Sequence, residues 1–229
     1  PTSGVTDTSD VITLDNTGIA DLAGNRLLSM PFGAASAPAL VSLDVSDNAL
    51  ADVAGVAGLN ALRVLVVDGN TVVTTLAELG ALPALERLSA RNCGLTDARG
   101  LEGLSAACTD VDFSGNRIGD LSGFAAAAAS LAGLRTLNLA GNALESLDQL
   151  ESLAALRALA AVDLSDTPIA DADAFKAEVV LRLPGVKTVS GEAVTDEDRE
   201  AATELKAQRK AEAEAAAAAE AEAEAEEDE

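Results

Sequence analysis

The stretch LVSLDVSDNAL at residues 40–50 returns almost unchanged as LRTLNLAGNAL at residues 134–144, and weaker copies lie before, between and after them. Both stretches read L-x-x-L-x-L-x-x-N-x-L, a repeat in which each copy supplies one strand and one return segment. A single copy cannot bury its own leucines, so neighbouring copies have to stack and share one core. The pattern therefore predicts a solenoid of strand-and-return units.

Seven copies of the repeat align on the middle leucine of the strand, a slot that holds Ile12, Leu43, Leu65, Leu88, Val111, Leu137 and Val162. Inward and outward residues alternate around this slot, which predicts strands at residues 11–14, 42–45, 64–67, 87–90, 110–113, 136–139 and 161–164. The first spacing is the longest, and we expect residues 24–38 to form an inserted loop or extra turn there. A second long spacing predicts a short helix at residues 124–130.

One slot after the strand holds asparagine in most copies; its occupants are Thr17, Asn48, Asn70, Cys93, Asn116, Asn142 and Thr167. An asparagine side chain there can satisfy backbone groups where the chain turns away from the strand, and each such group left unpaired costs about 1–3 kcal/mol. Cys93 in this slot is therefore expected to be structural rather than redox-active. Cys108 falls in the first leucine slot of the fifth copy and is expected in the core.

The chain divides by pattern into four parts. An N-terminal extension at residues 1–8 precedes the repeats at 9–174, and a C-terminal cap at 175–191 precedes a tail at 192–229. The cap keeps a hydrophobic rhythm without the strand motif, as the open end of a solenoid requires. Ten alanines and nine acids make up the last 19 residues, so we expect a tail that is helical or disordered and buries little.

The repeats and the cap together indicate the fold class. We predict an α/β leucine-rich repeat solenoid, a right-handed horseshoe segment of seven repeats with a parallel sheet on its concave face. The stretch TPIADADAFKAEVVLRLPGVKTVSGEAVTDEDREAA at residues 167–202 resembles the cap of the leucine-rich repeat group that includes a regulatory subunit of protein phosphatase 1. Within that group it is most similar to the axonemal outer-arm dynein light chains.

This resemblance covers about residues 9–205 and is carried by Pro168, by Arg182-Leu183-Pro184 and by the turn Val189-Ser190-Gly191. It implies a non-catalytic protein-binding adaptor that is a structural component of a large assembly, a ciliary axoneme. The alternative that it leaves open is a regulatory binder of a phosphatase or of basic nuclear proteins.

The formal net charge of −23 argues against nucleic-acid or anionic-membrane partners, which need basic surfaces. The chain has no histidine, nucleophile motif or phosphate-binding loop, so we expect no enzyme activity, cofactor, metal or small-molecule substrate. Only two cysteines occur and no signal-peptide pattern opens the chain, which favours an intracellular, cytoplasmic location. Other proteins are the expected partners.

The outward strand positions predict where such a partner docks. Neighbouring strands lie about 4.8 Å apart, so Arg87 should face Asp110, and Arg91 should face Asp68. The expected docking patch on the concave face consists of Val64, Val66, Arg87, Arg91, Asp110 and Asp112. The competing interpretation is a solvated ladder of ion pairs, each contributing about 0–1 kcal/mol.

Overall fold

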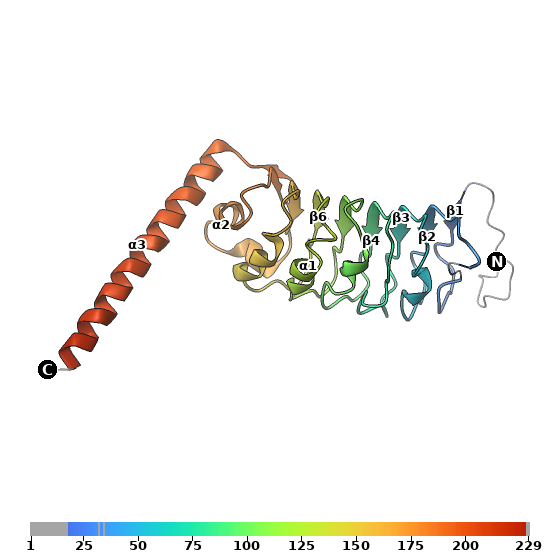
Figure 1. The fold of residues 1–229 in the computed structure, drawn as a ribbon, viewed down its shortest axis with the longest axis horizontal. Helices are drawn as coiled ribbons and strands as arrows, with labels where there is room; N and C mark the ends of the chain where they lie inside the picture. The colour runs from blue at the N-terminus through green and yellow to red at the C-terminus, as the bar shows by residue number, and fades with distance from the viewer. Residues whose placement is uncertain (1–17, 32, 34, 228–229) are drawn as a thin grey trace.

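The protein is a row of strand-and-return units that ends in a long helix (Figure 1). This structure, a computed structural model, describes residues 18–31, 33 and 35–227. The strands run side by side along one face, the return segments line the opposite face, and the helix projects from the C-terminal end. The predicted leucine-rich repeat solenoid is thereby confirmed.

Within the described residues, nine strands form one sheet in chain order, with β1 to β8 parallel and β9 antiparallel to β8. They are β1 (Ile19–Asp21), β2 (Ser42–Asp44), β3 (Val64–Val66), β4 (Arg87–Ser89), β5 (Asp110–Asp112), β6 (Thr136–Asn138), β7 (Ala161–Asp163), β8 (Thr188–Val189) and β9 (Glu192–Ala193). Strands β2 to β7 lie at the six predicted positions from residue 42 onward. Their middle residues pair in one row from Leu43 to Val162, as the alignment required.

The alignment of the first repeat was wrong. The neighbour of β2 is β1, in which Ala20 pairs with Leu43, so the middle slot belongs to Ala20 and not to Ile12. The strand predicted at residues 11–14 lies outside the described residues. Asn25 takes the asparagine slot, where its Nδ2 donates to the carbonyl oxygen of Leu22 at 2.7 Å. The described residues of 24–38 therefore belong to an ordinary return segment, and the small side chain of Ala20 concealed the repeat.

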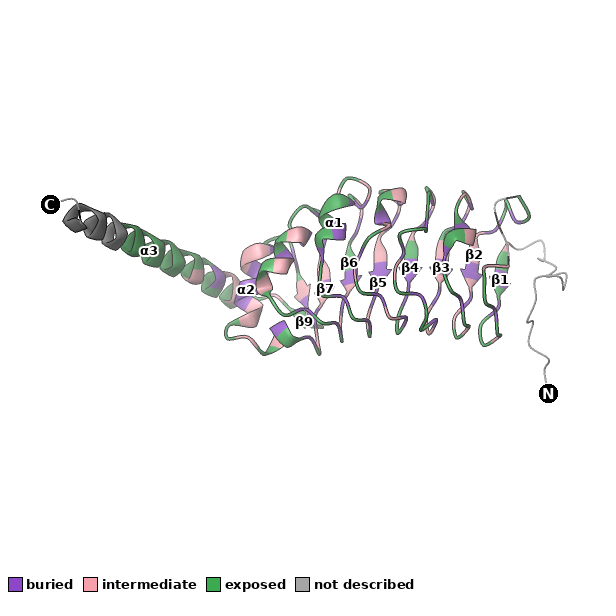
Figure 2. Cartoon of the chain, turned by 90° about the horizontal axis from the view of Figure 1, so that it is seen from below, coloured by how far each residue is buried: buried purple, intermediate pink, exposed green. Residues whose placement is uncertain are grey.

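The return segments contain short helical turns whose apolar side chains meet the strand leucines in one core. They are η1 (Ala54–Val56), η2 (Leu101–Gly103), α1 (Ser122–Ala126), η3 (Leu147–Leu153) and η4 (Pro168–Asp171). Helix α1 confirms the expected short helix near residues 124–130, although it begins and ends a few residues earlier. Figure 2 shows buried residues recurring from one repeat to the next, which makes the core a continuous column.

A left-handed backbone residue precedes each asparagine slot and turns the chain out of the strand. The φ angles there are 69° at Gly24, 53° at Asp47, 71° at Gly69, 50° at Asn92, 68° at Gly115, 65° at Gly141 and 56° at Asp166. Glycine, aspartate and asparagine are the residue types that tolerate this conformation best. At Gly115 a Cβ would also lie 2.1 Å from Oδ1 of Asn92, so a residue with a side chain here would require the exposed Asn92 side chain to move.

The asparagine side chains form the predicted ladder between repeats. Asn116 is representative: its Oδ1 accepts the N–H groups of Cys93, Gly94 and Leu95 at 2.9–3.1 Å. Its Nδ2 donates to the carbonyl oxygens of Ala90 and Phe113 at 2.7 and 2.8 Å. Asn48, Asn70 and Asn142 likewise join their own turns to the turn of the preceding repeat.

The cysteine in this slot plays the same structural role. The Sγ of Cys93 donates to the carbonyl oxygen of Val67 at 3.3 Å, which is the bond that an asparagine Nδ2 makes to the preceding repeat. A thiol has no amide oxygen that could accept an N–H group of the preceding repeat. In that repeat, the N–H of Val73 donates instead to the carbonyl oxygen of Asn70 at 2.9 Å. Cys93 and Cys108 are both buried and both free.

The last repeat is covered by helix α2 (Phe175–Arg182) and strand β8, as the cap interpretation required. Val179 and Val186 of this segment are 0% and 1% exposed and belong to the main core. Helix α3 (Asp196–Glu227) follows and packs on α2 over its first turns, where Ala202 is buried. Residues 206–217, the described side chains toward the end of the tail, are all exposed, as expected of a tail that buries little.

Candidate functional site

The sheet face, meaning the outward side of β1 to β8, brings the predicted docking residues together. Val64 and Val66 lie half-buried on β3, and Arg87 is exposed on β4. Asp110 and Asp112 lie on the next strand, where they pair in register with Arg87 and Ser89. The outward residues of neighbouring strands therefore lie side by side across the sheet, as the sequence predicted. These side chains differ in whether the fold already supplies them with partners.

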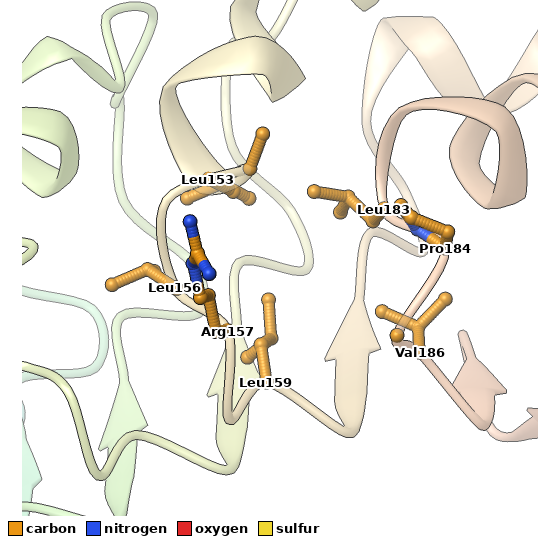
Figure 3. A pocket seen from close by; sticks show the side chains of 9 residues that line it. Leu153, Leu156, Arg157, Leu159, Leu183, Pro184 and Val186 are labelled. Atoms are coloured by element: carbon orange, nitrogen blue, oxygen red, sulfur yellow. The ribbon is translucent and has the colours of Figure 1, made fainter.

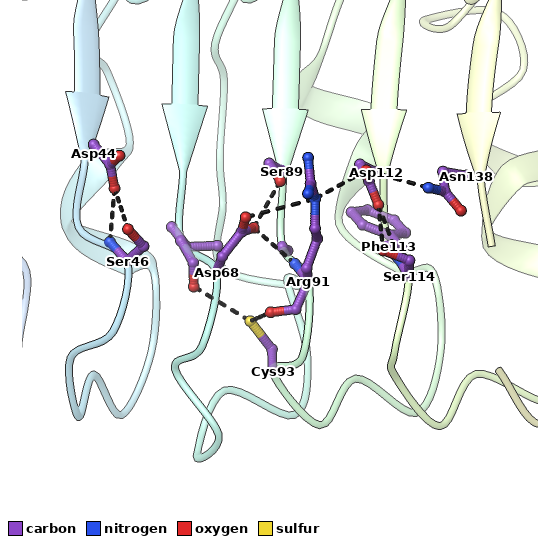
Figure 4. Close-up of polar contacts among 12 residues, drawn as sticks. Asp44, Ser46, Asp68, Ser89, Arg91, Cys93, Asp112, Phe113, Ser114 and Asn138 are labelled. Atoms are coloured by element: carbon purple, nitrogen blue, oxygen red, sulfur yellow. Dashed lines mark hydrogen bonds and ion pairs between the residues drawn. The ribbon is translucent and has the colours of Figure 1, made fainter. Parts of the chain in front are cut away.

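Arg91 is already engaged by two aspartates (Figure 4). Its Nε lies 2.9 Å from a carboxylate oxygen of Asp112 and 3.6 Å from one of Asp68. The expected pair with Asp68 is present, but Asp112 is the closer partner. Asp68 also accepts the backbone N–H of Arg91 at 2.8 Å and the hydroxyl of Ser89 at 2.6 Å. Arg91 therefore acts mainly as a bridge between neighbouring repeats.

Arg87 behaves differently from Arg91. Among the ion pairs of the described residues none involves Arg87, so the expected pair with Asp110 is not formed. The carboxylate of Asp110 instead accepts the hydroxyl of Thr109 at 2.6 Å, a partner one residue away in the chain. Arg87 thus presents an exposed guanidinium that the fold itself does not use.

A hollow of about 230 Å³ opens on the sheet face at this point. Its polar lining includes Arg87, Arg91, Asp110, Asp112, Thr136 and Asn138. Val64 and Val66 are not among its lining residues and form the half-buried surface beside it on β3. The hollow is therefore shifted by one strand from the patch that the sequence predicted. Thr136 and Asn138 on β6 line it, and Val64 and Val66 on β3 do not.

Several aspartates at the ends of the strands serve the fold. Asp44, Asp112 and Asp163 each accept the backbone N–H and the hydroxyl of the serine two residues later, at 2.5–3.0 Å. The recurring Asp-x-Ser pattern was the sequence signal for these turns. The carboxylate of Asp112 also contacts Arg91 and Asn138, so its oxygens are occupied within the fold.

The described residues offer no other obvious reactive centre. No group of three or more His, Cys, Asp or Glu that could hold a metal occurs among them. Burial raises the pKa of the Cys93 thiol to about 11 and that of the Cys108 thiol to about 12, which keeps both protonated near neutral pH. None of the helices in the described part of the chain is long and apolar enough to cross a membrane.

A second hollow lies at the seam between the repeats and the cap. Figure 3 shows Leu153, Leu156 and Leu159 on one side of it, and Leu183, Pro184 and Val186 on the other. Its volume is about 200 Å³, and Arg157 stands at its wall. Nothing in the sequence marked this seam, because it arises where the cap replaces the return segment of a further repeat.

Comparison with known proteins supports the fold. No family model and no curated protein matches the chain. Among solved structures, internalin C2 from Listeria monocytogenes is 24% identical, with a TM-score of 0.54 over 75% of this chain and 69% of that one. A leucine-rich repeat protein from Leptospira interrogans is 21% identical, with a TM-score of 0.58 over 74% of this chain. This chain covers 48% of the Leptospira protein, about half its length.

A further internalin from Listeria monocytogenes is 16% identical, with a TM-score of 0.52 over 76% of this chain and 60% of that one. Identities this low establish a shared architecture and no shared partner. The sheet of parallel strands, the asparagine ladder and these structural neighbours lead to one conclusion: the chain has the leucine-rich repeat fold.

Proposed function

We propose that this protein is a non-catalytic adaptor that docks a protein partner on its sheet face, around the hollow beside Arg87. The observation that carries the proposal is the exposed guanidinium of Arg87, which forms no ion pair within the described residues although the chain holds 38 acidic residues. A cation left unpaired in so acidic a chain is available to an incoming acidic side chain.

The shape of the sheet face supports the same proposal. The side chains around the middle row are small, including Ser42, Val64, Ser89 and Ala161, so a partner can approach the strands closely. Val64 and Val66 supply apolar surface to bury, and Thr136 and Asn138 supply hydrogen-bonding groups. A small apolar centre with a polar rim is the usual composition of a docking site.

Site-directed crosslinking tests the proposal. A photoreactive amino acid is placed at Thr136 on the sheet face, and, as a matched control, at exposed Glu102 on the return face. In cells that express the full chain, we expect a crosslinked protein from position 136 and not from position 102. Adding Arg87→Glu should abolish that adduct. Adducts from position 102 alone would place the contact on the return face and refute the proposal.

A more specific proposal, about the assembly in which the protein works, rests on the resemblance of its cap to the leucine-rich repeat group described above. We propose a structural role in a large intracellular assembly, a ciliary axoneme, and keep a regulator of a phosphatase or of basic nuclear proteins as the alternative. The acidic tail favours the alternative, because nine acids without a base in residues 211–229 complement a basic partner. Retention of the tagged chain in salt-washed axonemes supports the first assignment, and a soluble nuclear pool supports the second.

A further inference from the structure

The bases and acids of the sheet face lie on opposite sides of it. Backbone hydrogen bonds extend the strand register by one residue before the strands, through Arg63, Glu86, Thr109, Arg135, Ala160 and Lys187. The amino margin is defined here as Arg63, Arg87, Arg135 and Lys187, which lie at or just before the strand starts. The carboxyl margin is defined as Asp21, Asp44, Asp68, Asp112 and Asp163, which lie at or just after the strand ends.

The bases of the amino margin are largely free. Of the four, Arg63 pairs with Glu86 at 2.6 Å, and the ion pairs of the described residues include none from Arg87, Arg135 or Lys187. All four side chains belong to exposed residues. Glu86 and Asp110 are the acids in the same rows, so four bases face two acids along this side.

Along the carboxyl margin, acidic residues outnumber basic ones. Its five aspartates share a single base, Arg91, which lies between Asp68 and Asp112. The adjoining turns add the acids Asp47 and Asp166 and the bases Arg26 and Arg117, so acids still outnumber bases on this side by seven to three. The sheet face therefore carries net positive charge along one side and net negative charge along the other.

The dimensions of this surface match one α-helix. From the row of Arg63 to the row of Asp68 the face is about 16 Å wide at about 3.3 Å per residue, and a helix with its side chains is about 10–12 Å across. Eight parallel strands spaced by about 4.8 Å extend for about 34 Å, the length of about 22 helical residues.

From this arrangement we infer that the sheet face binds a helix of a protein partner that carries acidic side chains along one flank and basic side chains along the other. The acidic flank lies on the amino margin and the basic flank on the carboxyl margin. The inference rests on the proposed function and specifies its partner: charge order across the sheet, rather than net charge, selects the helix and sets its orientation.

Two synthetic helical peptides of 22 residues test the inference. Both are alanine-based and have the same numbers of Glu and Lys. The bipolar peptide places Glu along one flank and Lys along the opposite flank, and the mixed peptide places both on both flanks. Binding to the full chain is followed by fluorescence anisotropy at low salt. We expect the Kd of the bipolar peptide to be at least about tenfold lower than that of the mixed peptide, with the difference shrinking as salt rises.

Variants of the chain complete the test. Arg87→Glu with Arg135→Glu should raise the Kd of the bipolar peptide at least about tenfold. The matched control, Lys206→Glu with Lys210→Glu, makes the same charge change on exposed residues of α3 and should leave the Kd within about twofold. Circular dichroism of each variant verifies that the fold is retained.

The outcomes separate the inference from the proposed function. Equal binding of both peptides, with both weakened by the double variant at the amino margin, would show that the sheet face docks helices without charge order. The inference would then fall and the proposed function would stand. Binding of neither peptide, or no effect of the double variant, also overturns the inference, while the crosslinking experiment decides the proposed function independently.

Discussion

Arg209 in the tail helix forms an ion pair with Glu178 in the cap helix, 31 residues earlier in the chain. Glu178 is only 5% exposed and is also paired with Arg182, whose guanidinium reaches Asp148 in η3 at 2.9 Å. A buried carboxylate is tolerated only when it is paired and hydrogen-bonded. The first half of α3 is thus connected electrostatically to the cap and, through Arg182, to the sixth repeat.

This connection predicts that the two halves of the tail differ in their effect on stability. Truncation after Lys210 removes residues 211–229 and should change the melting temperature by less than about 2 °C. Truncation after Thr195 removes Ala202 from the core and Arg209 from Glu178, and should lower the melting temperature by about 5–10 °C. Differential scanning calorimetry of both truncated chains provides the measurement, and equal melting temperatures would contradict the contact.

The asparagine ladder predicts a large cost for Asn116→Ala. The substitution leaves three backbone N–H groups and two carbonyl groups of adjoining turns without their partner. Since each buried group left unpaired costs about 1–3 kcal/mol, the loss should be about 3 kcal/mol or more. Urea unfolding measures it. Asn60→Ala, at an exposed asparagine, is the control and should cost close to nothing.

Burial of the two thiols predicts that neither reacts in the native state. Because the thiolate is the reactive form, the raised pKa values of Cys93 and Cys108 keep both thiols inert at pH 8. A chromogenic disulfide reagent should detect no thiol in the folded chain and two after addition of denaturant. Rapid reaction of one thiol without denaturant would show that its repeat opens locally.

The start of α3 predicts a pH-dependent contribution to stability. The backbone N–H of Thr195, which donates to Asp198 at 2.7 Å, together with Lys176 at 3.0 Å, lowers the pKa of the Asp198 carboxyl. A carboxyl whose pKa is lower in the folded state than in the unfolded state stabilises the fold above its unfolded value of about 3.9. That stabilisation disappears as the pH falls through the lowered pKa of the folded state.

The wild type should therefore be more stable than Asp198→Asn at pH 7, and the difference should narrow as the pH falls below about 4. Chemical denaturation at a series of pH values measures this difference. Glu200→Gln, at an exposed residue of the same helix turn, is the control and should show no such trend. A difference that stays constant down to pH 2 would mean that the carboxylate of Asp198 does not act through its charge.

The sequence predicts six strands, the cap helix and the asparagine ladder. It can do so because each position of the repeat has a preferred residue type and a defined place in a strand or a turn. Leu43 and Leu137 lie where their motif places them, and Cys93 takes an asparagine position. The first repeat could not be aligned in this way, because Ala20 occupies a leucine slot and leaves too weak a hydrophobic signal. The row positions of the candidate site followed from the same spacing.

The sequence by itself determined the repeat, the direction of the strands and the list of outward residues, since all three follow from local periodicity. Only the tertiary structure decided which charges are used. Arg91 is taken up by Asp112, while Arg87 forms no ion pair with the described residues, and Arg209 joins Glu178 across the boundary between tail and cap. Periodicity specifies on which face a side chain lies, but its partner depends on side-chain geometry and competing hydrogen bonds between segments that are distant in the sequence.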